Sequence, residues 1–370
     1  MSFSQVERNA LISHSSDDAL DLVVVGGGIT GAGIAHDAAV RGLSVALVEK
    51  NDFASGTSSR SSSLIHGGLR YLEQLNFKLV FEAVQERALL TKLAPHLVQP
   101  IPFLFPVYKG DRVGLFTMRM GLTLYESLAF FKTYKRHHVY RKEATLNVEP
   151  ELLREGLKGS ISYYDCMTSD ARLTLETMIA AQRAGARVGN YLRVKKIAPR
   201  DAQSRFRLEI HDEEGQRDLV LRAYTVINAG GPWSDDVRRL LENDQDHLIR
   251  PTKGVHVVVP KYRLPVRHAV VMTSREDKRI IFAIPWPNAT VIGTTDTDYD
   301  ESIDEIIGDS HDIGYLLEIT NHYFPDARLG REDIISTWAG VRPLIREEGL
   351  SAGDTSREHE LRISPEGLIS

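Results

Sequence analysis

The order of apolar and polar positions along the chain predicts strands and helices in alternation. DLVVVGG at 21–27 is a short run of mostly apolar, β-branched residues that ends at glycines, which is typical of a buried parallel strand. Residues 29–42 have helical composition and end at a glycine, and LSVALVEK at 43–50 predicts a second buried strand. After a polar leader at 1–19, the chain therefore begins with a complete β-α-β unit.

The same alternation continues along the rest of the chain. The further elements that we expect are a Ser/Gly/Thr-rich loop at 51–64, a helix from about Asn76 to Leu93, a proline-rich passage between domains at 95–110, a helix at 114–132, a helix and then a strand at 169–188, a strand, glycine turn and helix at 225–241, strands across 253–300, and a strand, turn and return strand in the final ELRISPEGLIS.

These elements predict an α/β protein, α+β overall, in which two domains are interleaved along the chain. We assign residues 20–100, 160–248 and 345–370 to a Rossmann-like domain that binds a dinucleotide. A mostly antiparallel β-sheet domain, which would bind the substrate, takes residues 101–159 and 249–344.

Composition narrows the class of protein. The 370 residues are enough for two cores, and 42% hydrophobic with 26% charged residues is ordinary for a globular protein. A net charge of -5 disfavours nucleic acid as a partner. The single cysteine, Cys166, fits a reducing compartment, and we find neither an export signal nor eighteen consecutive apolar residues. We therefore expect a cytoplasmic protein, with peripheral membrane contact left open.

The first glycine turn predicts a dinucleotide site. Gly26, Gly28 and Gly31 form a G-x-G-x-x-G pattern between the first strand and its helix, where glycines allow a tight turn, a close pyrophosphate and close helix packing. Glu49 ends the second strand, where a carboxylate accepts hydrogen bonds from ribose hydroxyls and disfavours NADP.

Two further segments favour FAD over NAD, because a longer, wrapped dinucleotide needs more contacts than the first turn supplies. INAGGPWSDD at 227–236 predicts a second strand end that could close on the same cofactor, through Ala229, Gly230 and Trp233. The loop at 55–63 offers hydroxyl and amide donors to a pyrophosphate, among them Thr57, Ser58 and Ser59.

The segment GGGITGAGIAHDAAVRGLSVALVEKNDFASGTSSRSSSLIHGGLRYLE at 26–73 resembles the N-terminal block of FAD-dependent glycerol-3-phosphate dehydrogenases, which belong to the D-amino-acid-oxidase-like flavoproteins. The resemblance covers nearly the whole chain from about residue 20. It continues in YYDCMTSDARL (163–173), NAGGPW (228–233), TKGVHVVVP (252–260), EDKRIIFAIPW (276–286), IGTTDTDY (292–299) and WAGVRPL (338–344).

The resemblance implies a flavin ring near the IHGGLRYLE segment. Gly67 and Gly68 would let the backbone approach the isoalloxazine, because a Cβ would collide with it. His66 would stand beside the reacting carbon as a base with a suitable pKa, and Arg70 and Tyr71 would point into the substrate pocket.

The same resemblance implies a reaction. Glycerol 3-phosphate would be oxidised to dihydroxyacetone phosphate, with FAD as cofactor and a membrane quinone as the final acceptor. Arg342 would stabilise the developing alkoxide. The phosphate would be bound bidentately by Arg70 and by the point charge of Lys253.

Simpler interpretations of these residues stay open. A lone histidine near glycines is more often a turn residue, Lys253 could be an ordinary turn lysine, and Arg342 a surface strand end. We leave Arg279 out of the site as solvent-facing, interpret the pair at 137–138 as surface histidines, predict no metal site, and expect Cys166 to serve packing. The aromatic, basic stretch at 125–142 fits lipid contact and a buried helix equally well.

Two departures from the family affect these expectations. Ser63 stands where family members often have lysine, which removes a cation near the pocket. Family members also continue beyond the position of Ser370 with a Gly-rich turn and a helical C-terminal domain, so we interpret the chain as a fragment or a shortened form that binds FAD weakly by itself.

Three other functions remain open on sequence grounds. They are a glycerol-3-phosphate oxidase that reduces oxygen, another FAD-dependent oxidoreductase of hydroxy or amino acids, and a non-catalytic remnant. The sequence does not predict the oligomeric state.

Overall fold

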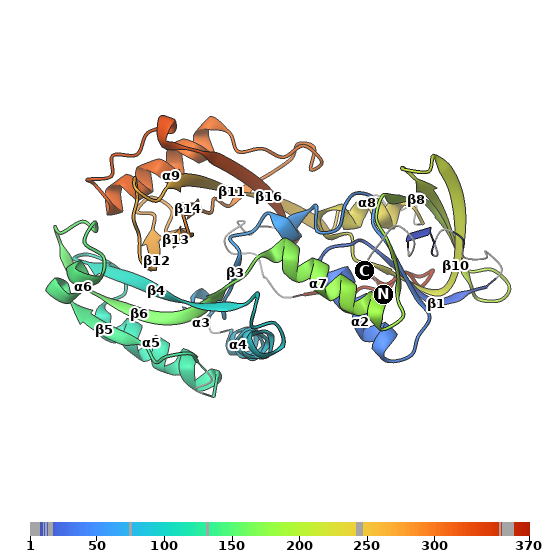
Figure 1. Cartoon of the computed structure of the whole chain (residues 1–370), viewed down its shortest axis with the longest axis horizontal. Helices are drawn as coiled ribbons and strands as arrows, with labels where there is room; N and C mark the ends of the chain where they lie inside the picture. Colours follow the sequence, from blue (N-terminus) through green and yellow to red (C-terminus); the bar gives the residue numbers. More distant parts are fainter. Residues whose placement is uncertain are drawn as a thin grey trace.

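The computed structural model describes residues 8–9, 11, 13, 18–73, 76–130, 133–241, 247–347, 349 and 359–370. Their two β-sheets form two lobes that lie next to each other along the long axis of the molecule (Figure 1). We call the lobe around the six-stranded sheet the first lobe and the lobe around the ten-stranded sheet the second lobe.

The first lobe holds the predicted β-α-β unit. Its sheet has the strand order β7-β2-β1-β10-β9-β8, parallel from β7 to β10 and antiparallel from β10 to β8. The strands are β1 (Leu20–Val25), β2 (Val45–Val48), β7 (Arg187–Gly189), β8 (Leu192–Ala198), β9 (Phe206–Asp212) and β10 (Arg217–Asn228).

Two helices, α2 (Ile29–Val40) and α7 (Asp170–Arg183), lie side by side on one face of this sheet (Figure 1). Small buried residues of α2, such as Ala32 and Ala35, let the helix pack closely on the valines and leucines of β1 and β2. After β10 come the 3₁₀ turn η2 (Gly231–Trp233) and the short helix α8 (Ser234–Arg239). The expected helix of the second glycine turn is thus only six residues long.

The second lobe is the predicted, mostly antiparallel sheet. Its main path runs β15-β11-β14-β13-β12-β4-β6-β3, with β16 paired to β11 and β5 paired to β6. The strands are β3 (Leu64–Ile65), β4 (Gln99–Tyr108), β5 (His138–Arg141), β6 (Leu157–Met167), β11 (Ile249–Pro260), β12 (Ala269–Thr273), β13 (Ile280–Pro285), β14 (Ala289–Gly293), β15 (Thr297–Asp298) and β16 (Ser336–Ile345).

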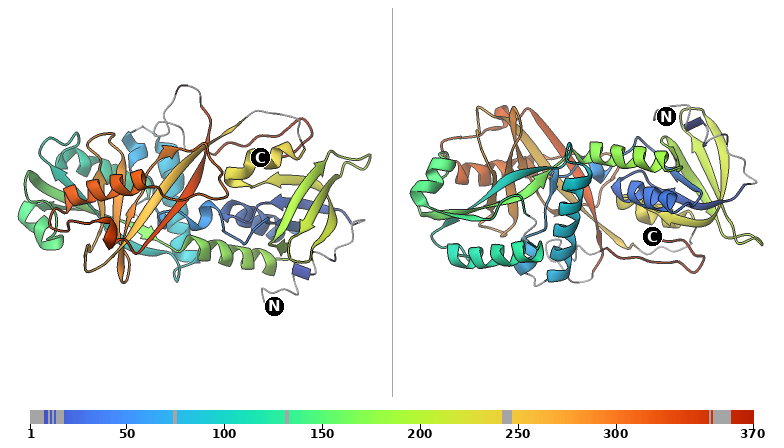
Figure 2. Two further views of the ribbon diagram at one scale, coloured as in Figure 1. Left: turned by 90° about the horizontal axis from the view of Figure 1, so that it is seen from above. Right: turned by 60° about the horizontal axis from the view of Figure 1, so that its bottom comes forward.

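Helices flank this second sheet. They are α3 (Arg70–Glu73), α4 (Phe77–Leu93), α5 (Leu115–Leu128), α6 (Lys142–Val148) and α9 (Ser310–Tyr323), with 3₁₀ turns η1 (Thr57–Ser59) and η3 (Arg331–Asp333) elsewhere in the chain. The right-hand view in Figure 2 shows α4 and α5 next to each other, and Val84 and Leu122 share one buried cluster there. Among the described helices, none has the length and apolarity needed to cross a bilayer.

The proline-rich segment at 95–110 is mostly a strand, not a passage between domains. Pro100, Pro102 and Pro106 of β4 occupy positions of the same parity, so their nitrogens all point to one side of the strand. β4 pairs with β6 along its length and with β12 only at Phe103 and Leu104. The missing N–H groups therefore fall on one edge of the strand only, and the strand still forms.

The boundary between the lobes differs from the expected one. The strands β3 and β6 belong to the second sheet, although most of their residues were expected in the dinucleotide domain.

The final segment behaves as predicted at its turn, with hydrogen bonds that join Arg362 and Ser370. Its last residues also pair with β10, because the Ile369 N–H donates to the Val226 carbonyl and the Asn228 N–H donates to the Ile369 carbonyl.

Candidate active site

The turn between β1 and α2 is shaped by its glycines. Gly26 has φ +117°, and a Cβ on Gly31 would collide with the carbonyl oxygen of Gly26. Gly28 is the N-cap of α2 and carries no side chain over the helix N-terminus. No side chain of the N-cap residue therefore covers the first amides of α2, which is the backbone geometry that suits a phosphate.

Glu49 and Ser58 complete this turn. Each carboxylate oxygen of Glu49 accepts one main-chain hydrogen bond, from Gly27 at 2.6 Å and from Asn51 at 2.8 Å. A carboxylate has about four lone-pair positions, so both oxygens keep the capacity to accept from ribose hydroxyls. Ser58 Oγ accepts from the Ile29 N–H at 3.0 Å, which leaves the serine O–H as a donor at the helix N-terminus.

The other two hydroxyls of the expected pyrophosphate loop are used inside the protein. Thr57 Oγ1 donates to the Val341 carbonyl at 2.6 Å, and Ser59 Oγ donates to the Gly56 carbonyl at 3.4 Å. Neither hydroxyl hydrogen is therefore directed at a phosphate in this structure, in contrast to the expectation.

The second glycine turn lies directly against the first. The Ala229 N–H donates to the Val25 carbonyl at 2.8 Å, and a Cβ on Gly26 would collide with the Ala229 carbonyl. Trp233 packs over Gly56, where a Cβ would be 2.9 Å from the indole ring. The two turns and the loop form one cradle, whose amides, Ser58 and Glu49 fit the phosphates and a ribose of a dinucleotide.

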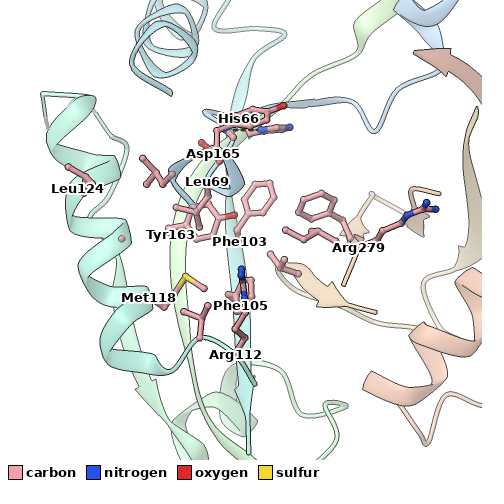
Figure 3. Close-up of a pocket in the computed structure, with 18 of the residues that line it drawn as sticks. His66, Leu69, Phe103, Phe105, Arg112, Met118, Leu124, Tyr163, Asp165 and Arg279 are labelled. Carbon is pink, nitrogen blue, oxygen red and sulfur yellow. Dashed lines mark hydrogen bonds between the residues drawn. The ribbon is translucent and has the colours of Figure 1, made fainter. Parts of the chain in front are cut away.

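A cavity of about 820 Å³ lies in the second lobe. Figure 3 shows Met118 and Leu124 of α5 on one side, Phe103 and Phe105 between, and Arg279 on the other side. The polar lining includes His66, Tyr71, Arg112, Arg279, Thr294, Asp296 and Arg342. The fold thus brings together three residues that the sequence predicted for the site, His66 and Tyr71 from one segment and Arg342 from a distant one.

One hydrogen bond decides which nitrogen of the neutral His66 ring carries the proton. Its Nδ1 accepts a hydrogen bond from the Gly68 N–H at 3.0 Å. A neutral imidazole has one acceptor nitrogen, so the neutral ring carries its proton on Nε2. The ring is exposed to the cavity, but the surrounding protein and the charge of Arg87 lower the pKa of His66. In this arrangement the Nε2 of His66 offers an N–H donor to the cavity, and the role of His66 as a base stays a prediction.

Gly67 and Gly68, next to His66, are required because the protein's own side chains fill the space that a Cβ would need. A Cβ on Gly67 would collide with Val84 and Tyr125, and a Cβ on Gly68, where φ is +65°, would collide with the ring of Tyr71. The space that a Cβ would fill is thus occupied by the protein's own helices. Contact of these peptides with a flavin stays a prediction.

Arg342 packs against a glycine of the neighbouring strand β11, where no side chain stands in the way. Its Nη1 is 3.1 Å from Asp296 Oδ1, and its Nη2 donates to Thr294 Oγ1 at 3.1 Å. Gly254 of β11 lies beneath, and a Cβ there would be 2.6 Å from Nη2. The guanidinium is therefore held in the cavity wall by a glycine, a hydroxyl and a carboxylate.

Lys253 does not line the cavity, in conflict with the expected phosphate contact. It pairs with Val341 across β11 and β16, and successive strand residues point to opposite faces, so Lys253 points away from Arg342. Its Nζ lies 2.8 Å from Asp309 and 2.6 Å from Asp312 at the start of α9. Burial acts to lower the pKa of Lys253, but the two carboxylates outweigh it and raise the pKa.

Arg279 was missed by the sequence reasoning. The residue lines the cavity and also pairs with Asp277 at 3.3 Å. Its place in EDKRII, among charged residues at a strand start, suggested a solvent-facing side chain.

The structure describes the backbone of Arg70 at the start of α3 but not its side chain. The phosphate contact predicted for Arg70 therefore lies outside what the structure describes.

His256 is a second residue that the sequence reasoning did not single out. Its ring is 2% exposed, stacks on Trp338 at 4.9 Å, and bonds to Ser62 Oγ through Nε2 at 2.8 Å. Burial and the nearby charge of Arg342 lower the pKa of His256 to about 3. This histidine is therefore a neutral part of the wall behind Arg342.

In the described ranges, no three His, Cys, Asp or Glu side chains gather as a metal site would require.

Comparison with known proteins gives a consistent result. The family model "FAD dependent oxidoreductase" matches residues 21–364. The aerobic glycerol-3-phosphate dehydrogenases of Staphylococcus haemolyticus and Staphylococcus aureus strain USA300 are 43% and 41% identical to the chain. Each match covers 100% of this chain and 66% of the relative, so the chain spans about two-thirds of the length of these curated relatives.

Solved structures share the fold. The glycerol-3-phosphate dehydrogenase of Bacillus halodurans, complexed with FAD, has a TM-score of 0.80 at 37% identity and covers 100% of this chain and 63% of its own. A glycine oxidase of Geobacillus kaustophilus has a TM-score of 0.70 at 23% identity, covering 95% and 88%, and shows the fold alone. Because the family match spans both the cradle and the cavity, the chain belongs to the FAD-dependent oxidoreductase family.

Proposed function

We propose that the chain oxidises sn-glycerol 3-phosphate to dihydroxyacetone phosphate with FAD as the hydride acceptor. The observation that carries the proposal is the convergence of His66, Tyr71, Arg279 and Arg342 on one cavity, in a chain similar to glycerol-3-phosphate dehydrogenases. The cradle formed by the two glycine turns suits the cofactor, as its open helix N-terminus and Glu49 indicate.

The charges of the cavity favour a phosphate ester over a simple carboxylate. The lining carries three arginines, Arg112, Arg279 and Arg342, against two carboxylates. One of these carboxylates, Asp165, is 2% exposed and is paired with Arg87. Guanidinium groups suit a dianion because they can bind its oxygens through paired N–H groups, which Arg279 and Arg342 would here share with Asp277 and Asp296. Lys253 has no part in this proposal.

When FAD is bound, it supplies the acceptor for the hydride that leaves C2. The C2 hydroxyl proton is released to solvent in the net reaction. Arg342 and the Nε2–H of His66 would hold the C2 oxygen and stabilise the negative charge that develops on it. Arg279, between β12 and β13, lies on the side of the cavity opposite α5 and would bind the phosphate there. Tyr71 also lines the cavity, next to Gly68.

We further propose a membrane quinone as the electron acceptor, with peripheral membrane contact. The α5 side of the cavity is apolar, through Met118, Met120 and Leu124. Phe116, Met120 and Leu124 are 76%, 60% and 40% exposed at a spacing of four residues, so they form one apolar stripe on α5. This stripe lies upstream of the stretch at 125–142, where Tyr125, Glu126 and Ala129 are buried. Apolar contact of this kind suits a membrane surface and an isoprenoid chain.

The test is anaerobic reduction of the flavin in the FAD-loaded protein. We expect glycerol 3-phosphate to bleach the flavin absorbance, and glycerol, glycine and L-proline at the same concentration to leave it unchanged. Reduction by an amino acid but not by glycerol 3-phosphate would overturn the substrate assignment. Reoxidation by a quinone in lipid vesicles, compared with hydrogen peroxide formation in air, tests the acceptor.

A further inference from the structure

A buried polar cluster lies beneath the glycine pair that follows His66. Arg87 of α4, Tyr125 of α5 and Asp165 of β6 are 3%, 1% and 2% exposed. The Arg87 guanidinium makes a close ion pair with Asp165, and Arg87 Nη1 donates to the Tyr125 oxygen at 3.1 Å. The Tyr125 hydroxyl donates to Asp165 Oδ1 at 2.8 Å. Three elements of the second lobe thus meet in one charge-balanced network.

The network ends on the main chain next to His66. The Gly67 N–H donates to the Tyr125 oxygen at 2.7 Å. A tyrosine hydroxyl has one donor and two acceptor positions, and here Asp165, Arg87 and Gly67 use all three. The hydroxyl is therefore fully committed, and phenylalanine could replace none of these contacts.

The turn that Tyr125 holds is also the turn that binds the imidazole. Gly67 donates to Tyr125, and the next amide, Gly68, donates to His66 Nδ1 at 3.0 Å. Because Gly67 has no Cβ, the peptide lies directly against Val84 and the tyrosine ring. A displacement of the Gly67 amide would move the Gly68 amide, and with it the only partner of Nδ1 that the described contacts include.

We propose that Tyr125, held by Asp165 and Arg87, is a positioning residue that keeps the His66 imidazole with Nδ1 as acceptor and its N–H on Nε2, directed at the substrate oxygen. The proposal rests on the proposed function for the identity of that oxygen, and not for the state of the ring. It replaces the base role expected from the sequence with that of a neutral hydrogen-bond donor.

The electrostatics of the cluster support a neutral ring. Partial desolvation by the surrounding protein, and then the positive charge of Arg87, lower the pKa of His66. A protonated ring would also turn Nδ1 into a donor that faces the donor N–H of Gly68. The carboxylate of Asp165 could stabilise a charged imidazole, but its own charge is balanced by the ion pair with Arg87. Both effects act against the imidazolium.

The first experiment reads the ring directly. Histidine-labelled, FAD-loaded protein is examined by ¹⁵N NMR without substrate, and the His66 signals are assigned as those lost in His66→Gln. We expect the Nε2–H tautomer in the wild type and a mixture of tautomers in Tyr125→Phe. The matched control is Tyr323→Phe, which removes a buried hydroxyl bonded to Thr273 and should leave the His66 signals unchanged. An Nδ1–H tautomer in the wild type would overturn the proposal.

The second experiment separates donor from base. The side-chain amide of glutamine can place an N–H near the position of Nε2, and that of asparagine near Nδ1. We expect His66→Gln to keep the rate of flavin reduction within about tenfold, and His66→Asn to lose about 10²-fold or more. Equal losses of about 10²–10⁴-fold in both variants would indicate a base.

The substrate proposal fails separately from this one. If glycerol 3-phosphate reduced no flavin while the NMR signals behaved as expected, the assigned reaction would be wrong and the tautomer would stand. If Tyr125→Phe does not fold, Asp165→Asn takes its place, because it breaks the ion pair with Arg87 and so loosens the contacts that hold the Tyr125 hydroxyl. We expect the same shift toward mixed tautomers in that variant, and unchanged His66 signals would overturn the proposal.

Discussion

Gly254 lies directly against the guanidinium of Arg342. A Cβ at Gly254 would be 2.6 Å from Nη2 and 2.8 Å from Nη1 of Arg342, and 2.7 Å from the hydroxyl of Thr294. The positions lie on adjacent strands, β11 and β16, where Arg342 is opposite Thr252. The absence of a side chain at Gly254 thus sets the depth at which the arginine enters the cavity wall.

Gly254→Ala should therefore displace Arg342 without unfolding the protein, because the atoms in the way are the ends of flexible side chains. We expect kcat/KM for glycerol 3-phosphate to fall about 10²-fold and the thermal midpoint to change little. The control is Gly33→Ala in α2, where a Cβ would meet nothing within 4 Å and activity should be unchanged. Full activity in Gly254→Ala would mean that the position of Arg342 is not critical.

Lys253→Met tests the placement of that lysine outside the site. The variant leaves Asp312, which is 2% exposed, without its cation, so we expect about 3 kcal/mol lower free energy of unfolding. The KM for glycerol 3-phosphate should stay within about twofold, as measured by steady-state dye reduction of the FAD-loaded variant. A KM raised tenfold with unchanged stability would restore the lysine to the phosphate site.

Arg279 and Arg342 should have separable effects. Arg279→Ala should raise KM about 10-fold to 100-fold with kcat preserved, because a phosphate is bound alike in ground and transition states. Arg342→Ala should also lower kcat, by about 2–4 kcal/mol of transition-state stabilisation. Arg183→Ala, an exposed arginine in the last turn of α7, serves as the control. An effect of Arg342→Ala on KM alone would remove its role at the C2 oxygen.

The cradle predicts different defects at two of its glycines. Gly28→Val places a side chain in the open turn at the helix N-terminus, so the folded protein should lose its flavin absorbance. Gly31→Ala directs a Cβ at the Gly26 carbonyl, which is main chain and yields little, so the fold itself should lose stability. Flavin content after gel filtration and the thermal midpoint distinguish the two defects. A yellow, folded Gly28→Val protein would contradict the assignment.

His256 should make the protein sensitive to mild acid. Below pH 6.5 the unfolded chain protonates this ring, whereas the folded protein does so only near pH 3, so the unfolded state binds more protons and stability falls as the pH decreases. The expected loss between pH 7 and pH 5 is about 2 kcal/mol. Urea midpoints at both pH values should show a smaller loss in His256→Asn. Parallel pH dependence of the two proteins would show that the ring is charged in the fold.

Local patterns allowed much of the fold to be predicted. The β-α-β unit, the cradle and the strands after residue 253 depend on short-range spacing, which the sequence displays directly. The prolines of β4 were misjudged because tolerance of proline depends on the strands that pair with β4, and β6 and β12 come about 60 and 165 residues later. The assignment of β3 and β6 to a lobe was missed for the same reason.

The site was harder to predict because the type of a residue does not show to which face of a strand its side chain points. Lys253 looked suitable for a phosphate, but its partners, Asp309 and Asp312, come from a distant helix. Arg279 looked solvent-facing, yet it lines the cavity. The tautomer of His66 depends on an amide two residues away, a contact that no pattern of side chains encodes.

The interleaving of the two lobes restricts how the molecule can move. The chain passes from the first sheet to the second after β2 and after α8, and returns after β6 and after β16. A hinge needs its flexible residues to lie close to one axis. The crossings after β2 and after β6 run through described residues, and Thr57 in the first of them is bonded to Val341 of β16, so wide opening of the lobes would be costly. Entry and exit of small molecules should therefore depend on side chains and short loops around the cavity, such as Thr294–Asp296, while the distance between cradle and cavity stays nearly constant through a catalytic cycle.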